Sequence, residues 1–271
     1  YHEIHVEVSR EDTTVRARGG YTDHAPKDRV RRLIAAGLAL PGTVTDLPVT
    51  AQAFSSRRLD GSPNVLLAVA VEGSEIGMML TPDGERRISL DLHSIALEGT
   101  QQIDEAHEQL IARSTDEGHF EAVNDKPVTP RLVGYLAYQH EWTLGPATYT
   151  FNVAVVDNVT GRVGATSVEI EVPPYTDEDE WGISDPLLVT VDDAGRVHPV
   201  VLGRFVPGDN VVALVEVYGG QRPILSGQVF LETAGPDKGK QGARLFPLAM
   251  RPTVGGVHRG MVPLPAGMPP G

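Results

Sequence analysis

The sequence predicts an all-β protein of two immunoglobulin- or fibronectin-like β-sandwich modules, preceded by a strand pair and a short helix. Three observations predict this class. Runs rich in Val and Thr alternate apolar and polar residues with the two-residue period of a half-buried strand. The 29 Gly and 21 Pro residues divide these runs at short intervals, as turns do. Residues 144–149 have the spacing of a tyrosine corner, which is typical of Greek-key sandwiches.

The clearest elements form a hairpin near the middle of the chain. Apolar residues alternate along Thr148–Val156 and again along Val163–Val172, and the polar turn Asp157–Gly161 joins the two runs. Just upstream are the corner residues Leu144, Pro146 and Tyr149. We expect Tyr149 to be buried, with its hydroxyl bonded to the backbone a few residues upstream.

Residues 1–46 are predicted to be the end of an upstream domain. Tyr1–Arg18 alternates like a hairpin, and Lys27–Leu40 has apolar residues at helical spacing before Pro41-Gly42 ends the pattern. Because the chain begins with Tyr1 inside an alternating run, we expect further sequence before it. We also expect the hairpin to pair outside both sandwiches.

The first sandwich is predicted to span residues 47–172. Thr115–Thr129 is expected to be a loop. Ile103–Arg113 is expected to be a helix, because Ile103, Ala106, Leu110 and Ile111 fall on one helical face. The expected strands are Leu47–Ser55, Asn64–Val71, Arg86–Leu97, Arg131–Thr143, Thr148–Val156 and Val163–Val172.

An acidic linker at residues 173–182 precedes the second sandwich, at 183–260, and a flexible tail is expected at 261–271. The strands expected in this module are Leu187–Val191, Val197–Leu202, Asn210–Tyr218, Gly227–Glu232 and Arg244–Met250.

Composition excludes several classes of protein. The chain has no Cys, which rules out disulfides, thiol chemistry and a Cys-ligated zinc site. No apolar run approaches the roughly 20 residues that cross a bilayer. The net charge of −13 argues against nucleic acid or an anionic membrane as the main partner.

Charge is unevenly distributed, and this suggests an interaction surface. The linker carries Asp177, Glu178, Asp179 and Glu180 beside Trp181, whereas the C-terminal part from Lys238 onward has five bases and no acid. Those bases are Lys238, Lys240, Arg244, Arg251 and Arg259. One hypothesis is that the basic part docks on the acidic linker, within the chain or on a second copy. The alternative is two solvated regions that never meet.

Three segments resemble the C-terminal part of bacterial proteins related to von Willebrand factor type A, as known from Acidobacteria. Residues 2–21 read HEIHVEVSREDTTVRARGGY, residues 144–173 read LGPATYTFNVAVVDNVTGRVGATSVEIEVP, and residues 203–220 read GRFVPGDNVVALVEVYGG. Pro146-Ala147 stands where those proteins have Pro-Gly. The resemblance implies an exported, periplasmic or extracellular protein with a type A domain upstream and β-sandwich modules after it. The metal motif Asp-x-Ser-x-Ser of type A domains does not occur in this chain.

Candidate chemistry is sparse. A metal site through His107, Asp104, Glu108, His119 and Glu121 has no familiar ligand spacing, so we expect solvated charge there instead. His2 and His5 would lie on opposite faces of a strand, and Asn158-Val159-Thr160 forms a short sequon on the hairpin turn.

We therefore expect no enzyme, no cofactor and no metal, but a structural or protein-interaction module that binds protein, including copies of itself. The alternative is a carbohydrate-binding accessory module of an extracellular enzyme, in which Tyr138 and Trp142 would stack on sugar.

Overall fold

The computed structural model describes residues 2–6, 9, 20–21, 26–58, 62–114, 120–123, 135–174, 182–191, 197–200, 211–218, 226–231, 244–252 and 258–263. Antiparallel strands dominate these residues, and the only long helix among them is α1 (Pro26–Ala39). The all-β prediction is confirmed, and α1 begins and ends within one residue of the predicted helix.

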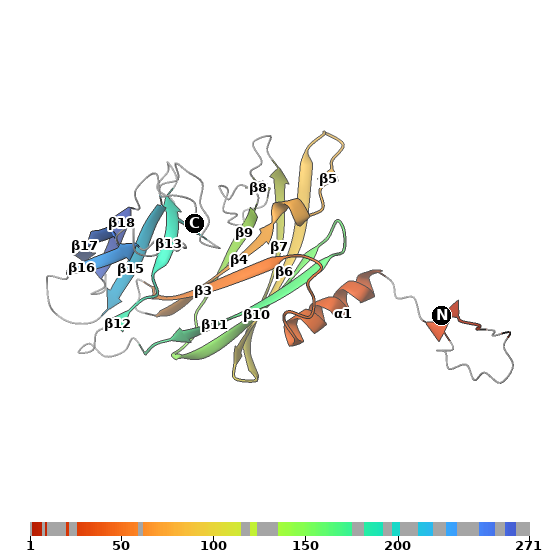
Figure 1. Ribbon diagram of the computed structural model, residues 1–271, viewed down its shortest axis with the longest axis horizontal. Helices are drawn as coiled ribbons and strands as arrows, with labels where there is room; N and C mark the ends of the chain where they lie inside the picture. Colours follow the sequence, from red (N-terminus) through yellow and green to blue (C-terminus); the bar gives the residue numbers. More distant parts are fainter. Residues whose placement is uncertain are drawn as a thin grey trace.

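Two antiparallel sheets form the first unit (Figure 1). The larger has the order β11-β10-β6-β7-β8, with β5 beside β6, and the smaller has the order β3-β4-β9. The larger sheet contains β5 (Met79–Leu80), β6 (Arg86–Glu98), β7 (Gln101–Ser114), β8 (Phe120–Ala122), β10 (Ala147–Asp157) and β11 (Val163–Val172). The smaller contains β3 (Val49–Arg57), β4 (Pro63–Glu72) and β9 (Tyr135–Trp142), and the short helix η1 (Gly73–Glu75) follows β4.

The main core lies between these sheets. Every second residue of β6 from Ile88 to Ala96 is buried, and so are alternate residues of β4 from Val65 to Val71. Phe151 of β10 is fully buried in the same cluster. The two-residue alternation of apolar side chains that predicts these strands therefore also determines which face of each strand is buried in the core.

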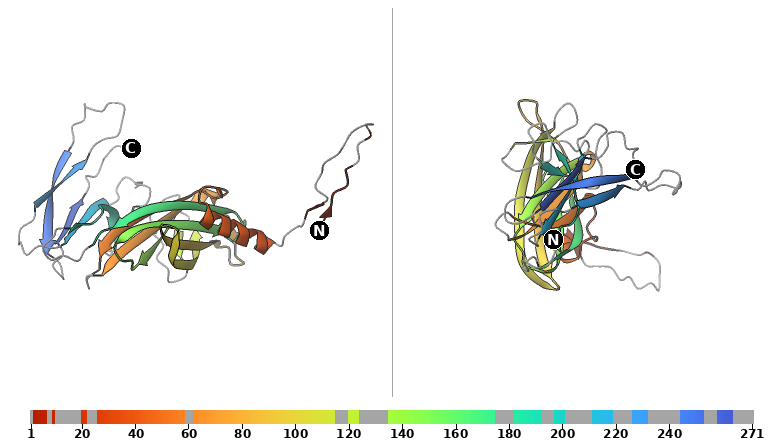
Figure 2. Two further views of the ribbon diagram at one scale, coloured as in Figure 1. Left: turned by 90° about the horizontal axis from the view of Figure 1, so that it is seen from below. Right: turned by 90° about the vertical axis from the view of Figure 1, so that its left-hand side faces the viewer.

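Helix α1 covers the outer face of β10 and β11, as both figures of the ribbon show (Figures 1 and 2). Val30, Leu33, Ile34 and Leu38 pack on a second apolar cluster that includes Ala154. The Asn152 side-chain amide donates to the carbonyl oxygen of Leu38 at 2.7 Å, which satisfies one of the last carbonyls of the helix.

The predicted helix at Ile103–Arg113 is wrong, because these residues lie in β7. Strand β7 pairs with β6 from Gln101 to Arg113, with one irregularity between Ala96 and Leu97. The pairing places Leu110 and Ala112 in the core. Long cross-strand pairing outweighs a weak helical period here.

Other differences concern short elements. Strand β8 lies inside the predicted loop at Thr115–Thr129. In the N-terminal segment, β1 (His2–Glu3) pairs with β2 (Gly20–Tyr21), and this two-stranded sheet is separate from the larger sheets. The remainder of both segments lies outside the described residues, apart from 4–6, 9 and 123.

The second unit is a seven-stranded sheet with the order β14-β13-β15-β18-β17-β16 and β12 on β15. Strand β17 pairs with β16 along its first part and with β18 at its end. Strand β18 extends into the predicted tail as far as Pro263. The strands are β12 (Gly182–Ile183), β13 (Leu187–Val191), β14 (Val197–Pro199), β15 (Val211–Tyr218), β16 (Ser226–Leu231), β17 (Arg244–Pro252) and β18 (His258–Pro263).

Candidate functional site

Side chains of the second unit bind the outer edge of β3. The backbone N–H and the hydroxyl of Ser55 both donate to Oδ2 of Asp185, at 3.1 and 3.2 Å. Two residues on, the backbone N–H of Arg57 donates to the hydroxyl oxygen of Tyr218 at 2.9 Å. Within the described chain β3 pairs as a strand only with β4, so its second edge would otherwise present unpaired donors. The second unit therefore protects this edge with side chains instead of a strand.

Tyr218 also extends the core of the first sandwich onto the second unit. Its side chain is 2% exposed and belongs to the main core cluster of the first sandwich. Its strand, β15, is held in turn by Ser184, whose hydroxyl accepts from the backbone N–H of Glu216 at 2.9 Å. A buried aromatic ring and satisfied polar groups on both sides make this a fixed junction.

A groove of about 600 Å³ opens beside the junction. Phe54 and Leu66 of the first unit form one apolar wall, and Leu187 and Leu214 of the second form the other. The remaining lining residues are polar: Ser55, Ser56, Arg57, Arg58, Asn64, Glu141, Ser184, Asp185 and Glu216. We call this cavity the junction groove. Apolar walls with a few fixed polar groups are typical of binding sites.

Arg58 forms the rim of the junction groove. Its Nε donates to Oδ1 of Asn64 at 3.1 Å, and one terminal nitrogen pairs with Glu141 at 3.4 Å. Asn64 is itself fixed by a bond from its amide to the hydroxyl of Ser56. The Arg58 and Glu141 side chains are 38% and 60% exposed, so the ion pair orients the rim and contributes little stability.

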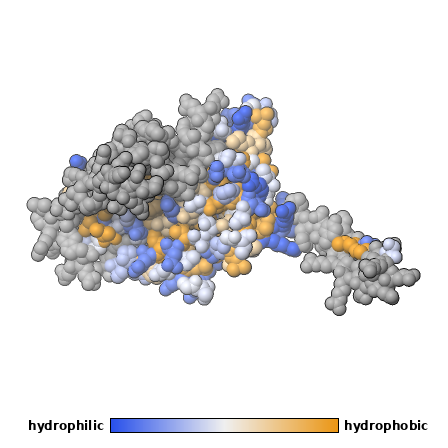
Figure 3. Space-filling model, in the orientation of Figure 1, coloured by the Kyte–Doolittle hydropathy of each residue, from blue (hydrophilic) through white to orange (hydrophobic). Residues whose placement is uncertain are grey.

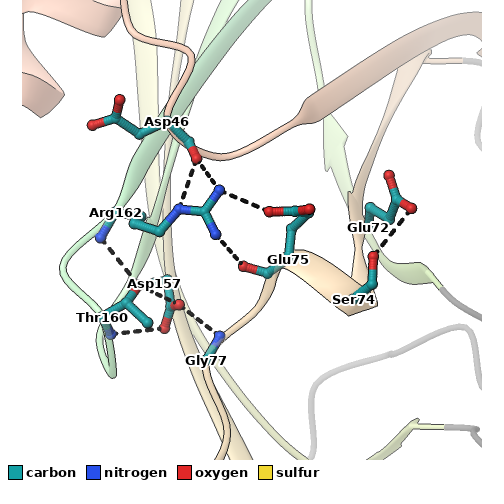
Figure 4. Close-up of polar contacts among 8 residues, drawn as sticks. All are labelled: Asp46, Glu72, Ser74, Glu75, Gly77, Asp157, Thr160 and Arg162. Atoms are coloured by element: carbon teal, nitrogen blue, oxygen red, sulfur yellow. Dashed lines mark hydrogen bonds and ion pairs between the residues drawn. The ribbon is translucent and has the colours of Figure 1, made fainter.

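A buried carboxylate fixes the segment that leads to β5. Asp157 has no exposed surface, and its Oδ2 accepts from the backbone N–H of Gly77 at 2.7 Å and from the Thr160 hydroxyl at 2.6 Å. Its Oδ1 accepts from the backbone N–H of Val159 at 2.9 Å. Figure 4 shows Asp157 reaching across from the β10–β11 turn to this segment.

Arg162 holds the same segment two residues earlier. Its guanidinium donates to the backbone carbonyl of Glu75 at 2.9 Å and pairs with the Glu75 carboxylate at 2.9 Å (Figure 4). It also donates to the carbonyl of Asp46 through two nitrogens. Residues 75–77 are therefore anchored at both ends.

Beyond this anchor the hairpin exposes apolar side chains. Met78, Met79 and Leu80 are 43%, 52% and 70% exposed, and Val159 on the neighbouring turn is 40% exposed. We call these four residues the β5 tip. Apolar surface is visible in Figure 3 at the end where Figure 1 draws β5.

The His and carboxylate candidates that the structure describes do not gather at one point. His107 stacks on His93 of β6, with ring centroids 4.2 Å apart, whereas Glu108 points the other way and lies 4.0 Å from His140. Within the described residues no group of three or more His, Asp or Glu could hold a metal ion. His119 is outside the description, as is the side chain of Glu121.

Tyr138 and Trp142 do not form a sugar platform. Both belong to the main core, at 7% and 3% exposure, and Trp142 packs against Phe151. Burial raises the pKa of Tyr138, and Glu108 raises it further. The Tyr149 hydroxyl donates to the carbonyl of Gly145 at 3.0 Å, which is the backbone bond that the corner spacing predicts.

The predicted charged surface falls largely outside the described residues. Asp177, Glu178, Asp179, Glu180, Trp181, Lys238 and Lys240 lie outside the described residues. Arg244 begins β17, and Arg251 of β17 pairs in register with Arg259 of β18, which pairs with Glu216. In backbone register, Arg251 and Arg259 therefore align across the sheet with Glu216, which lines the junction groove.

Sequence reasoning missed the junction residues, because nothing in the sequence connects Arg57 with Tyr218, 161 residues away. None of the described helices is long and apolar enough to span a bilayer. No protein-family model matches the chain, and no curated protein matches it.

Proposed function

We propose that this protein is a non-enzymatic protein-interaction module that binds an extended segment of a partner protein in the junction groove. The observation that carries the proposal is the fixed junction itself. Tyr218 and Asp185 lock the second unit onto β3, so the two walls of the groove have a defined spacing before any partner arrives. A groove formed in advance costs less conformational entropy on binding.

The chemistry of the groove favours a polypeptide. Four apolar side chains can receive apolar side chains of a partner, and the Arg58–Glu141 rim offers both a cation and an anion. Such a combination matches a segment with apolar anchors flanked by charge. The carbohydrate alternative has less support, because Tyr138 and Trp142, the two aromatic rings expected to stack on sugar, lie in the core.

Export to the periplasm or cell surface, within a longer protein that has a type A-related domain upstream, is part of the same proposal. Its support is the resemblance of residues 2–21, 144–173 and 203–220 to such proteins. A role as a subunit of a surface assembly is supported by the junction, where Asp185 and Tyr218 hold the second unit on β3.

A displayed random peptide library tests the groove as a binding site. The chain is immobilised, binders are selected, and each is then measured against Leu66→Glu and Leu214→Glu, which alter opposite walls. We expect peptides with apolar anchors that lose at least about tenfold in affinity on both variants. Binders that are indifferent to both variants, or no binders at all, contradict the proposal. Glycan binding that is unaffected by both variants supports the carbohydrate alternative.

A further inference from the structure

We propose that the β5 tip of one copy of this chain occupies the junction groove of a second copy. The inference rests on the proposed function, since it takes the groove as the binding surface and names its occupant. The two surfaces differ, so the contact is head-to-tail and leaves one free tip and one free groove after each step. Repetition of the contact builds a chain of copies.

The β5 tip has the character of an interaction surface. A single exposed apolar side chain is ordinary, but three in succession at the end of a hairpin are not. Met78 and Met79 have flexible thioether side chains that adapt to an irregular cavity. Strand β5 pairs only with β6 within the described chain, so the tip stands at a sheet edge.

The tip is also held in advance of binding. Asp157 bonds the N–H of Gly77, and Arg162 bonds Glu75, so both anchors lie immediately before the first exposed Met. At the far side, the backbone N–H of Thr81 donates to the carbonyl of Glu85 at 2.9 Å and closes the turn. Little order remains to be gained on docking, which favours association.

Charge around the two surfaces is complementary. The turn end of the hairpin, residues 81–87, and Arg113 opposite Arg87 on β7 carry three bases and two acids, namely Arg86, Arg87, Arg113, Asp83 and Glu85. The groove is lined by three acids and two bases, namely Glu141, Asp185, Glu216, Arg57 and Arg58. An excess of one base therefore meets an excess of one acid, which orients the contact, while the apolar side chains supply the affinity.

A second copy, not the same chain, must supply the tip. Figure 1 places β5 and the second unit at opposite ends of the first sandwich, and the groove lies at the junction with the second unit. The sandwich between them is a packed core with two hydrogen-bonded sheets, so it cannot fold back on itself.

Sedimentation velocity across a concentration series tests the inference on the full chain. The parent is expected to show a mass that rises with concentration. Leu80→Glu in the tip and Leu66→Glu in the groove are each expected to remain monomeric, with at least about a tenfold loss in association constant. Ile103→Glu is the matched control. Ile103 is also an exposed apolar residue, but it lies near the start of β7, in the β6–β7 hairpin, so its replacement should leave association unchanged.

Mixing the two monomeric variants gives the sharper result. The tip of Leu66→Glu is intact and so is the groove of Leu80→Glu, so one productive contact remains. The other contact brings two introduced carboxylates together. We expect a 1:1 dimer and nothing larger. Leu214→Glu replaces Leu66→Glu as the groove variant if that protein fails to fold.

The outcomes separate this inference from the proposed function. A parent that stays monomeric, or a Leu80→Glu variant that still associates, overturns the tip as occupant, while groove-dependent peptides would leave the proposed function in place. Association should persist at 1 M salt, where the screening length is about 3 Å. Loss of association at high salt contradicts an apolar contact and points to docking between the acidic linker and the basic C-terminal part.

Discussion

The hydroxyl of Tyr218 donates to Oε2 of Glu216 at 2.7 Å while it accepts the backbone N–H of Arg57. Tyr218 and Glu216 are 2% and 4% exposed. A buried carboxylate is costly without donors, and a buried edge N–H is costly without an acceptor. The Tyr218 hydroxyl therefore links the Glu216 carboxylate of the second unit to the edge strand β3 of the first unit.

Replacing Tyr218 with Phe should destabilise this junction. The ring can still fill the core, but the acceptor for Arg57 and the donor to Glu216 disappear. We expect a loss of roughly 1–3 kcal/mol in the free energy of unfolding. Urea unfolding measures the loss, and amide hydrogen exchange at Arg57 should accelerate. An unchanged urea midpoint would show that the hydroxyl contributes nothing to the junction.

The tyrosine corner offers the same substitution in a simpler setting. Tyr149 is buried, and its hydroxyl donates to the carbonyl of Gly145. Tyr149→Phe should therefore cost about 1 kcal/mol, at the low end of the range for Tyr218→Phe. Urea midpoints of the two variants, measured side by side, check the order. A larger loss of stability in Tyr149→Phe would contradict the expectation that the Tyr218 hydroxyl, with its two hydrogen bonds, contributes more.

Gly164 allows the chain before β3 to approach β11. A Cβ at this position would collide with the carbonyl oxygen of Leu47, and Val49 Cγ2 would lie only 2.8 Å away. Gly164→Ala should cost roughly 1–3 kcal/mol, because backbone must move to make room. Gly145→Ala is the control, since a Cβ there has no neighbour within 4 Å, and its effect should stay within about 0.5 kcal/mol. Thermal unfolding of both variants checks the contrast, and equal unfolding temperatures would contradict it.

The sequence predicts the parts of this fold whose apolar residues have a clear period. Helix α1 and the second half of β11 each have one buried face and one polar face. In β10 the apolar residues from Tyr149 to Val155 alternate along the face of the main core, although α1 also buries the opposite face at Ala154. Strand β7 lacks such a period, since Ile103 and Asp104 lie exposed together near its start and blur the alternation. Its identity depends on pairing with β6, which the sequence does not show.

The candidate site was less predictable than the fold. At the junction groove, the donors on β3 are backbone N–H groups of Ser55 and Arg57, which every residue except Pro possesses. Their acceptors, Asp185 and Tyr218, come from another unit more than 100 residues later. The β5 tip can be recognised in the sequence, because Met78, Met79 and Leu80 form an uninterrupted apolar run just before the turn at Pro82-Asp83-Gly84.

His93 should make stability fall at mildly acidic pH. Burial lowers its pKa below the usual 6.5 and stacked His107 lowers it further, while Asp91 acts in the opposite direction. Below about pH 6.5, His93 therefore binds a proton in the unfolded chain while it stays neutral in the folded chain. The free energy of unfolding drops as pH falls from there through the folded pKa.

His93→Gln removes this contribution, so the variant should lose less stability than the parent between about pH 7 and pH 5. His107→Gln removes one cause of the shift and should give an intermediate loss. Urea unfolding at both pH values measures the differences. If parent and His93→Gln lose the same amount, the proton uptake lies elsewhere.

Asp157 should control both the stability of the first unit and the order of the hairpin that carries the β5 tip. Its two oxygens accept from Gly77, Val159 and Thr160, so both must be acceptors. In Asp157→Asn one oxygen becomes an NH₂ group that faces donors, which should cost roughly 1–3 kcal/mol. Amide exchange at Gly77–Leu80 should accelerate with it, because the anchor before the tip is weakened.

Asp83→Asn is the matched control on the same hairpin. The Asp83 carboxylate accepts the Thr81 hydroxyl, which an amide oxygen can also do, and a hydrogen bond from that hydroxyl is the main cause of its lowered pKa. This variant should have the same urea midpoint as the parent, because an exposed side chain away from the core contributes little to stability. Self-association should weaken in Asp157→Asn although every tip residue is unchanged, because an unanchored hairpin must be ordered on docking. Full association by a destabilised Asp157→Asn would show that the anchor serves the fold and not the contact.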